Sequence, residues 1–172
     1  MPELPEVEVV KKSLKKKIHQ LTIKKISIHQ KKLRYPINGV MLKKMINSKI
    51  ESIRRRSKYL LLNLDNNFTI LIHLGMTGKL LLVSPKYGKI KTSFYYNTYS
   101  VKEKHNHLSI LFNKSVKMIY NDVRKFGFIK VEKTKNLSQV SHLKFLGPEP
   151  LSIKFNKIYF QSQIKGRKKN IK

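Results

Sequence analysis

The sequence predicts an α+β domain, in which an N-terminal helix precedes an antiparallel β-sandwich or barrel-like unit with short flanking helices. Three observations predict this fold class. Apolar residues recur at helical spacing near the N-terminus, short β-rich runs fill residues 22 to 133, and polar three-residue turns join some of these runs. A chain of 172 residues fits one domain with at most a small extension.

The predicted helix covers residues 5 to 19. Pro5 suits the first helical position, where a missing N–H costs nothing. Lysines fill one face of this segment. The apolar face is formed by residues spaced three and four apart, namely Val7, Val10, Leu14 and Ile18.

Hairpin turns are predicted at Asp65-Asn66-Asn67 and Asn113-Lys114-Ser115, because each polar triplet separates two apolar runs. The predicted strands are residues 22–28, 59–64, 68–74, 107–112, 116–120 and 126–131. Short helices are expected at residues 38–47, 137–145 and 155–164. The polar stretch from about 84 to 104 is expected to be a mobile loop.

The composition of the chain limits which partners and which chemistry it can have. Lys plus Arg number 38 and Asp plus Glu number 9, so the net charge is +29, which favours polyanion binding. The absence of Cys excludes disulfides, thiol catalysis and Cys-ligated zinc within this chain. No apolar run reaches the roughly 20 residues of a membrane span, and the N-terminus lacks a secretory pattern. We therefore expect no membrane association and a cytoplasmic, nucleoid-associated location.

The N-terminus carries the sharpest chemical signal. Removal of Met1 would make Pro2 a free secondary amine, and an α-amine with a pKa of about 8 is partly neutral near neutral pH. Such an amine can form a Schiff base with an aldehyde carbon, beside Glu3 as a proton donor and acceptor. Glu6 lies three residues on, on the same helical face as Glu3. Spacing alone leaves open, and by itself favours, a plain helix start with acids at the positive end of the dipole.

The full string Pro2-Glu3-Leu4-Pro5-Glu6-Val7-Glu8 resembles the N-terminal signature of the formamidopyrimidine-DNA glycosylase family. These bacterial enzymes excise 8-oxoguanine and ring-opened purines and then cut the abasic strand. The resemblance continues in order through the segments 54–62, 73–78, 105–107, 122–127, 146–151 and 166–172. Its sequence departs mildly from the family pattern at Asn106, Val123 and Lys125, where the family has Asp, Pro and Arg.

The resemblance implies catalytic roles at the N-terminus and in one basic stretch. Pro2 would be the nucleophile at C1′ of the damaged nucleotide, and Glu3 the general acid and base. Lys58 would donate a proton and contact phosphate in the lyase step, with Glu6 as a further catalytic candidate. By composition alone, Lys58 is one more solvated lysine.

The resemblance also implies DNA contacts. A base inside a duplex must be extruded before it can be excised, and Met76 and Phe126 are apolar wedges suited to filling the gap. Arg124 would insert with them and offer its guanidinium to the orphaned base. The alternatives are that Met76 and Phe126 are core residues beside strands. The glycines that flank Met76, at positions 75 and 78, favour a tight exposed loop instead.

The resemblance further implies phosphate contacts from His105, Arg167 and Lys168, and it places His73 among the DNA-binding residues. His105 and His107 have a spacing that metal ligands can show, but no carboxylate or Cys cluster accompanies them. We therefore expect no metal in this chain.

The family has a second domain with a helix-two-turn-helix motif and a four-Cys zinc finger, and we expect this chain to lack it. Residues 1–150 would form the catalytic N-terminal domain and residues 151–172 a basic hinge at the start of the missing domain. No cofactor is expected here, since the family's zinc site lies in the missing part. The expected partners are damaged double-stranded DNA and a separately encoded C-terminal half, with the chain itself a monomer.

The leading interpretation is therefore a bifunctional DNA glycosylase and AP lyase domain. It would remove oxidised purines through a Schiff base on the N-terminal proline and cleave the abasic strand by β-elimination. The main alternative is a catalytically dead, truncated remnant that acts only as a basic nucleic-acid-binding module. An RNA-associated basic protein is disfavoured, because no RNA-recognition motif is present and the N-terminal signature would be unexplained.

Overall fold

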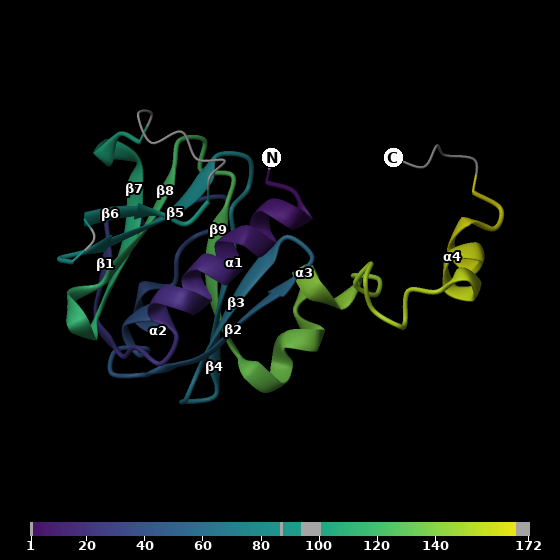
Figure 1. The fold of residues 1–172 in the computed structure, drawn as a ribbon, viewed down its shortest axis with the longest axis horizontal. Coiled ribbons are helices and arrows are strands. Elements are labelled where there is room, and N and C mark those ends of the chain that lie inside the picture. The colour runs from purple at the N-terminus through teal and green to yellow at the C-terminus, as the bar shows by residue number, and fades with distance from the viewer. Residues whose placement is uncertain (1, 87, 94–100, 168–172) are drawn as a thin grey trace.

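The structure is a computed structural model, and it describes residues 2–86, 88–93 and 101–167. Two antiparallel sheets enclose the main hydrophobic core, with a long helix along their side (Figure 1). The predicted α+β class is thus confirmed. A smaller buried cluster comprises Leu61, Leu71, Phe128 and Leu143. The helices are α1 (Leu4–Ile18), α2 (Gly39–Lys43), α3 (Ser141–Lys144) and α4 (Lys157–Ile164), and the 3-10 turns are η2 (Glu103–His105), η3 (Asn113–Ser115) and η4 (Thr134–Gln139).

The strands form a five-stranded sheet in the order β1-β7-β8-β5-β6 and a four-stranded sheet in the order β2-β3-β4-β9. Their bounds are β1 (Ile23–Ile28), β2 (Ile50–Arg56), β3 (Tyr59–Leu64), β4 (Phe68–His73), β5 (Gly78–Ser84), β6 (Gly88–Lys91), β7 (Asn106–Phe112), β8 (Lys117–Asp122) and β9 (Phe128–Lys133). The two predicted hairpins, β3–β4 and β7–β8, are confirmed.

Helix α1 forms as the apolar spacing predicts. Its four apolar residues at spacings of three and four are buried in the common core, and the helix packs against the edge strand β2. Pro5 lies in the first turn, and the carboxylate of Glu6 accepts a hydrogen bond from the backbone N–H of Glu3. This contact satisfies a donor that the helix leaves free at its N-terminus.

Two loops cross between the sheets at one end of the molecule. The first, residues 74–77, joins β4 to β5, and the second, residues 123–127, joins β8 to β9. β5 pairs with β8 at Gly78 and Asp122, and β4 pairs with β9 at His73 and Phe128. The two loops lie side by side, because the backbone N–H of Arg124 in the second loop donates to Thr77 Oγ1 in the first at 3.1 Å.

The expectation of a mobile loop over 84–104 is wrong for part of that range. Gly88–Lys91 forms strand β6, which pairs with β5, and Glu103–His105 forms η2. The polar composition hid a short edge strand, in which Ile90 packs against the core and the other positions are polar or glycine. Residues 94–100 lie outside the described part of the chain.

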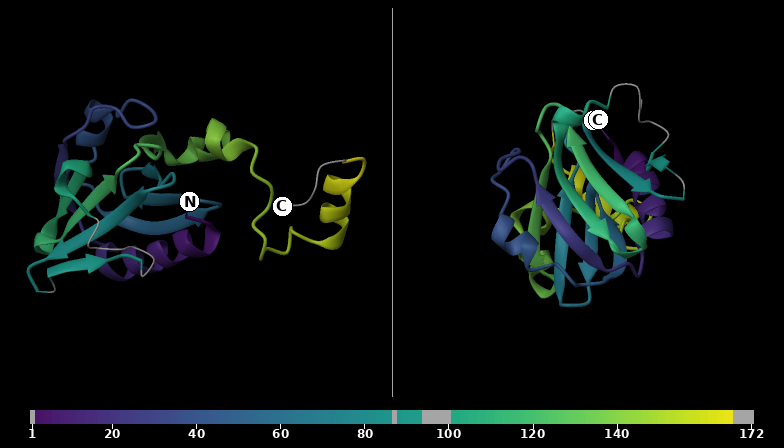
Figure 2. Two further views of the ribbon diagram at one scale, coloured as in Figure 1. Left: turned by 90° about the horizontal axis from the view of Figure 1, so that it is seen from above. Right: turned by 90° about the vertical axis from the view of Figure 1, so that its left-hand side faces the viewer.

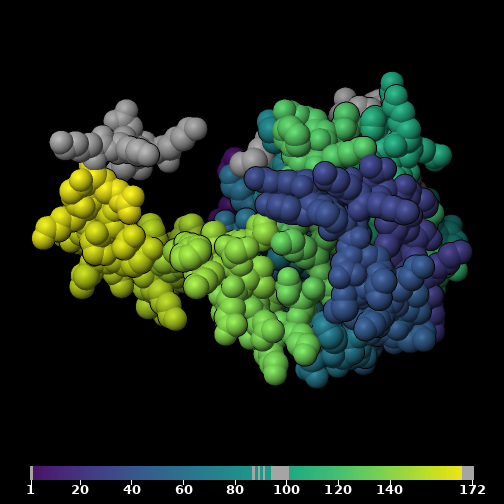
Figure 3. Space-filling model, turned by 180° about the vertical axis from the view of Figure 1, so that it is seen from behind, coloured from purple at the N-terminus to yellow at the C-terminus, as the bar shows by residue number. Residues whose placement is uncertain are grey.

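The C-terminal segment stands apart from the two sheets (Figures 1 and 2). In the space-filling view it forms a separate lobe that a narrow neck joins to the rest (Figure 3). Apolar side chains in and beside this lobe are exposed, among them Leu151, Ile153 and Ile158. The domain boundary at residue 150 remains a prediction. No helix in the described ranges is long and apolar enough to cross a membrane.

Candidate active site

The structure brings together the four predicted catalytic residues at the N-terminus of α1. Lys58, in the turn between β2 and β3, places its Nζ 2.5 Å from Oε2 of Glu3. Pro2 directly precedes Glu3 and is half-buried. Glu6 holds the backbone of Glu3 from the first helical turn. A carboxylate and an ammonium group are thus in contact directly beside Pro2, whose nitrogen becomes an amine only if Met1 is removed.

The turn that presents Lys58 is held to α1 by a second ion pair. Nε of Arg55 lies 2.8 Å from Oε2 of Glu8, and one terminal nitrogen of Arg55 donates to the carbonyl oxygen of Ser57 at 2.9 Å. Ser57 has a φ of 51°, the left-handed conformation that reverses the chain just before Lys58. The helix and the turn are therefore connected at two levels, by the pairs Glu3–Lys58 and Glu8–Arg55.

Glu149 completes this network, and its role was missed in the sequence. Its carboxylate accepts from Arg55 at 2.7 Å, from Arg56 at 3.0 Å and from the backbone N–H of Ser57 at 2.6 Å. Burial opposes ionisation of Glu149, but these hydrogen bonds and the arginine charges outweigh it and hold its pKa below the ordinary value. Arg56 also donates to the carbonyl oxygens of residues 146 and 147. The neck that leads to α4 is thus fastened to the turn that carries Lys58.

His73 lies at the end of β4 in an aromatic cluster. Its ring is stacked on Phe128 at a centroid distance of 5.4 Å and lies 4.9 Å from the ring of Tyr59. Burial, followed by the positive charges of Arg34 and other nearby groups, lowers the pKa of His73 to about 4. Because Nδ1 accepts from the backbone N–H of Gly75 at 3.2 Å, the neutral ring carries its proton on Nε2. That N–H can donate to a phosphate oxygen.

The two loops present the predicted wedge residues on the surface. Met76 and Phe126 are each 43% exposed, so the alternative that they are core residues is wrong. The guanidinium carbon of Arg124 lies 4.4 Å from the centroid of the Phe126 ring, a cation–π contact. These three residues, together with Arg34 and His73, border a cavity of about 660 Å³.

The other residues predicted to contact phosphate do not all lie near the site. His105 lies in η2, and desolvation together with the charges of lysines, Lys125 of the second loop among them, lowers its pKa. His107 is buried and donates a ring N–H to the carbonyl oxygen of Asp122 at 2.6 Å, a structural role. The structure does not bring Arg167 to the site: it follows α4 and bonds to the carbonyl oxygen of Gln163. Lys168 lies outside the described residues.

No group of three or more candidate metal ligands occurs in residues 2–86, 88–93 and 101–167. The four cysteines of the zinc finger that the resemblance implies have no counterpart in this Cys-free chain. We therefore derive no step through a metal, and the expectation that this chain carries no cofactor stays a prediction.

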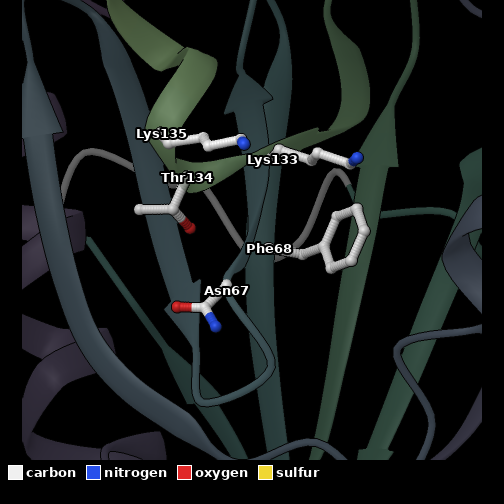
Figure 4. A pocket seen from close by; sticks show the side chains of 5 residues that line it. All are labelled: Asn67, Phe68, Lys133, Thr134 and Lys135. Atoms are coloured by element: carbon white, nitrogen blue, oxygen red, sulfur yellow. The ribbon is translucent and has the colours of Figure 1, made fainter.

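A second cavity of about 530 Å³ lies at the opposite end of β4 (Figure 4). Its lining residues are Asn67, Phe68, Lys133, Thr134 and Lys135. Strand β4 runs from Phe68 to His73, so its full length separates this cavity from the loops that carry Met76 and Phe126. None of the predicted site residues lines it.

A two-sheet domain flanked by one helix, with an N-terminal proline beside a Lys–Glu pair, has the arrangement of a DNA-repair glycosylase domain. The sequence model described as "Formamidopyrimidine-DNA glycosylase N-terminal domain" matches residues 1–129. The chain belongs to this family.

Similar proteins agree with this assignment. The chain is 36% identical over its whole length to the formamidopyrimidine-DNA glycosylase of Dinoroseobacter shibae and 37% identical to that of Rickettsia bellii. It spans only 59% and 58% of these relatives. Among solved structures it is similar to Lactococcus lactis Fpg in complex with DNA that contains an abasic site. The TM-score is 0.78 with 30% identity, over 95% of this chain and 56% of that one. The complex of Lactococcus lactis Fpg with DNA that contains N7-benzyl-Fapy-dG gives the same TM-score.

Proposed function

We propose that this chain is the catalytic part of a bifunctional DNA glycosylase and AP lyase that acts on oxidised purines in double-stranded DNA. The observation that carries the proposal is the 2.5 Å contact between Lys58 Nζ and Glu3 Oε2, next in sequence to Pro2, whose nitrogen becomes an amine on removal of Met1. This contact supports the roles of Glu3 and Lys58 as proton acceptor and proton donor beside a Pro2 nucleophile. The titles of the similar Lactococcus lactis structures, which name abasic-site and Fapy-containing DNA, support the substrate class.

The first step is nucleophilic. After removal of Met1, the lone pair of the Pro2 nitrogen forms a bond to C1′, and the bond from C1′ to the base breaks. The departing base takes the electron pair and a proton from water. The Pro2 nitrogen, now an ammonium, loses its proton to the Glu3 carboxylate. Its lone pair then forms the C1′=N bond of the iminium as the C1′–O4′ bond breaks, and O4′ takes the proton back from Glu3.

The second step cleaves the strand. The iminium withdraws electrons from C2′, which loses a proton to a base, and the C3′–O bond breaks with loss of the 3′-phosphate. Water finally hydrolyses the iminium and frees the amine. Lys58 stabilises the leaving phosphate, a role supported by the position of its ammonium group beside Glu3.

Duplex recognition comes from the two loops at the same end of the four-stranded sheet as Lys58, because Tyr59, which follows Lys58, pairs with His73, which precedes the first loop. Met76 and Phe126 fill the gap left by an extruded nucleotide, and Arg124 faces the orphaned base. Neutral His73 and His105 contact phosphates, while the net charge of +29 supplies salt-dependent attraction. The chain acts as a monomer on this duplex.

Borohydride trapping tests the proposal. The purified chain is mixed with a duplex that carries either an abasic site or 8-oxoguanine opposite cytosine, and borohydride reduces any Schiff base to a stable adduct. We expect an adduct with both duplexes, which is lost in Pro2→Gly and in a form that retains Met1. Salt-dependent binding without any adduct would contradict the proposal and support the alternative, a non-catalytic basic DNA-binding module.

A further inference from the structure

The wedge residues sit on two loops whose backbones touch. A Cβ atom added at Gly75 in the first loop would lie 2.5 Å from the backbone nitrogen of Gly127 in the second. A Cβ at Gly127 would lie 2.4 Å from the carbonyl oxygen of His73. No side chain fits between the loops at this point, so their backbones pack directly against each other.

A buried carboxylate lies beneath this contact. Asp122 is fully buried, at 0% exposure, at the end of β8. Its Oδ1 accepts from the hydroxyl of Thr77 at 2.5 Å, and its Oδ2 accepts from the backbone N–H of Gly127 at 2.9 Å and the hydroxyl of Tyr120 at 3.3 Å. Burying a carboxylate is costly unless hydrogen bonds compensate for lost water. Here the compensating donors come from both loops.

The hydrogen bonds also connect the loops to each other. The backbone N–H of Arg124 points at both Thr77 Oγ1, at 3.1 Å, and Asp122 Oδ1, at 3.3 Å. Thr77 follows Met76 directly, and Arg124 lies two residues before Phe126. A continuous path therefore runs from the first wedge through the Thr77 hydroxyl to the backbone that carries the second.

We propose that Asp122 is a positioning residue that joins the two loops into one rigid wedge, so that Met76, Arg124 and Phe126 enter the duplex as a unit. The inference rests on the proposed function, because it concerns how the damaged base is extruded. Asp122 touches none of the catalytic residues named above. Its loss should thus impair base extrusion and leave the chemistry on an already abasic sugar intact.

Two substitutions weaken, to different degrees, the junction formed by the hydrogen bonds of Asp122 and Thr77 between the two loops. Asp122→Asn keeps the shape but replaces one acceptor oxygen with an NH₂ group, which then faces a donor from one loop. Thr77→Val is nearly isosteric and removes only the hydroxyl that links the loops. The matched control is Asp65→Asn, the same chemical change in the β3–β4 turn, where Asp65 accepts from the backbone N–H of Lys49.

The primary readout is fluorescence of 2-aminopurine placed beside 8-oxoguanine, which rises on unstacking and requires no catalysis. Borohydride trapping on 8-oxoguanine and abasic duplexes is measured in parallel, with circular dichroism and salt-dependent binding. We expect wild type and Asp65→Asn to unstack the probe. In both junction variants the signal and the 8-oxoguanine adduct should fall about tenfold, with abasic trapping within about threefold of wild type.

The results of these measurements either support or overturn the positioning role of Asp122. Unstacking equal to wild type in both variants overturns the inference, as does a parallel loss of unstacking and abasic trapping. If Asp122→Asn does not fold, Thr77→Val alone decides. A wild-type chain that binds without unstacking also overturns it. Unstacking that depends on Asp122 in a chain that forms no adduct at all would sustain the wedge and refute the proposed chemistry.

Discussion

Replacing Glu149 with glutamine tests whether the neck of the molecule holds the turn that carries Lys58. The substitution keeps the size of the side chain and an oxygen that can accept from Ser57. It removes the negative charge that Arg55 and Arg56 contact at 2.7 and 3.0 Å. Both arginines then keep their charge beside a neutral amide.

The magnitude follows from the exposure of these groups. A hydrogen bond to a charged group contributes about 1.5–3 kcal/mol when shielded from water, and an exposed ion pair contributes about 0–1 kcal/mol. The side chains of Glu149, Arg55 and Arg56 are 25%, 13% and 29% exposed, between these two limits. We expect Glu149→Gln to lower the free energy of unfolding by about 2 kcal/mol at neutral pH.

Urea denaturation measures this difference, with Glu51→Gln on the exposed face of β2 as the control. The difference should depend on pH. The pKa of Glu149 is lowered by folding, so its contribution is complete above the ordinary value of 4.5 and is lost as the pH falls through the folded pKa. The unfolding curves of wild type and Glu149→Gln should therefore converge in acid.

Two results would refute this reasoning. One is a destabilisation by Glu149→Gln no larger than that of Glu51→Gln, which would mean that the arginines find equivalent partners. The other is a difference that persists unchanged in strong acid, where the wild-type carboxylate is protonated. Either result would show that Glu149 does not hold the turn that carries Lys58.

Three further predictions concern the wedge end of the sheets. Gly127→Ala should destabilise the fold by about 1–3 kcal/mol in urea, since the new Cβ would lie 1.8 Å from the hydroxyl of buried Tyr120; unchanged stability would contradict the packing. The pKa of His73 is lowered to about 4, so its contribution to stability is present above the ordinary value of 6.5 and is lost as the pH falls toward 4. His73→Gln should flatten the stability profile over that window, and an identical slope would argue against a buried neutral ring. Phe126→Ala should change stability by less than about 0.5 kcal/mol, because the ring is exposed. It should nevertheless lower cleavage of an 8-oxoguanine duplex more than cleavage of an abasic one.

Much of the fold could be predicted because its signals are local. The apolar spacing fixed α1 to within one residue, and the polar triplets at 65–67 and 113–115 marked both hairpins. Strand β2 was not predicted separately, because its bulge interrupts the apolar alternation and three arginines end it. Strand β6 was missed because an edge strand of four residues carries little apolar pattern.

Some residues of the candidate site could likewise be predicted from local sequence signals, and others could not. Pro2, Glu3 and Lys58 were predicted from contiguous motifs, and the structure brings them together. The roles of Glu149 and Asp122 could not be predicted, because they depend on contacts between distant segments. Glu149 lies 92 positions from Ser57, and Asp122 lies 45 positions from Thr77. The sequence gives two weaker signals for them: both lie in segments that resemble the family, 122–127 and 146–151, and both belong to only nine acids in a chain with 38 basic residues.

The most direct test of the account is to locate the covalent bond. The chain is reduced with borohydride on an abasic duplex and digested with nuclease and protease, and the peptides are sequenced by mass spectrometry. The account predicts a deoxyribose remnant on the nitrogen of Pro2, in a peptide that begins at residue 2. A remnant on the amine of Lys58, or none on any peptide, would contradict it.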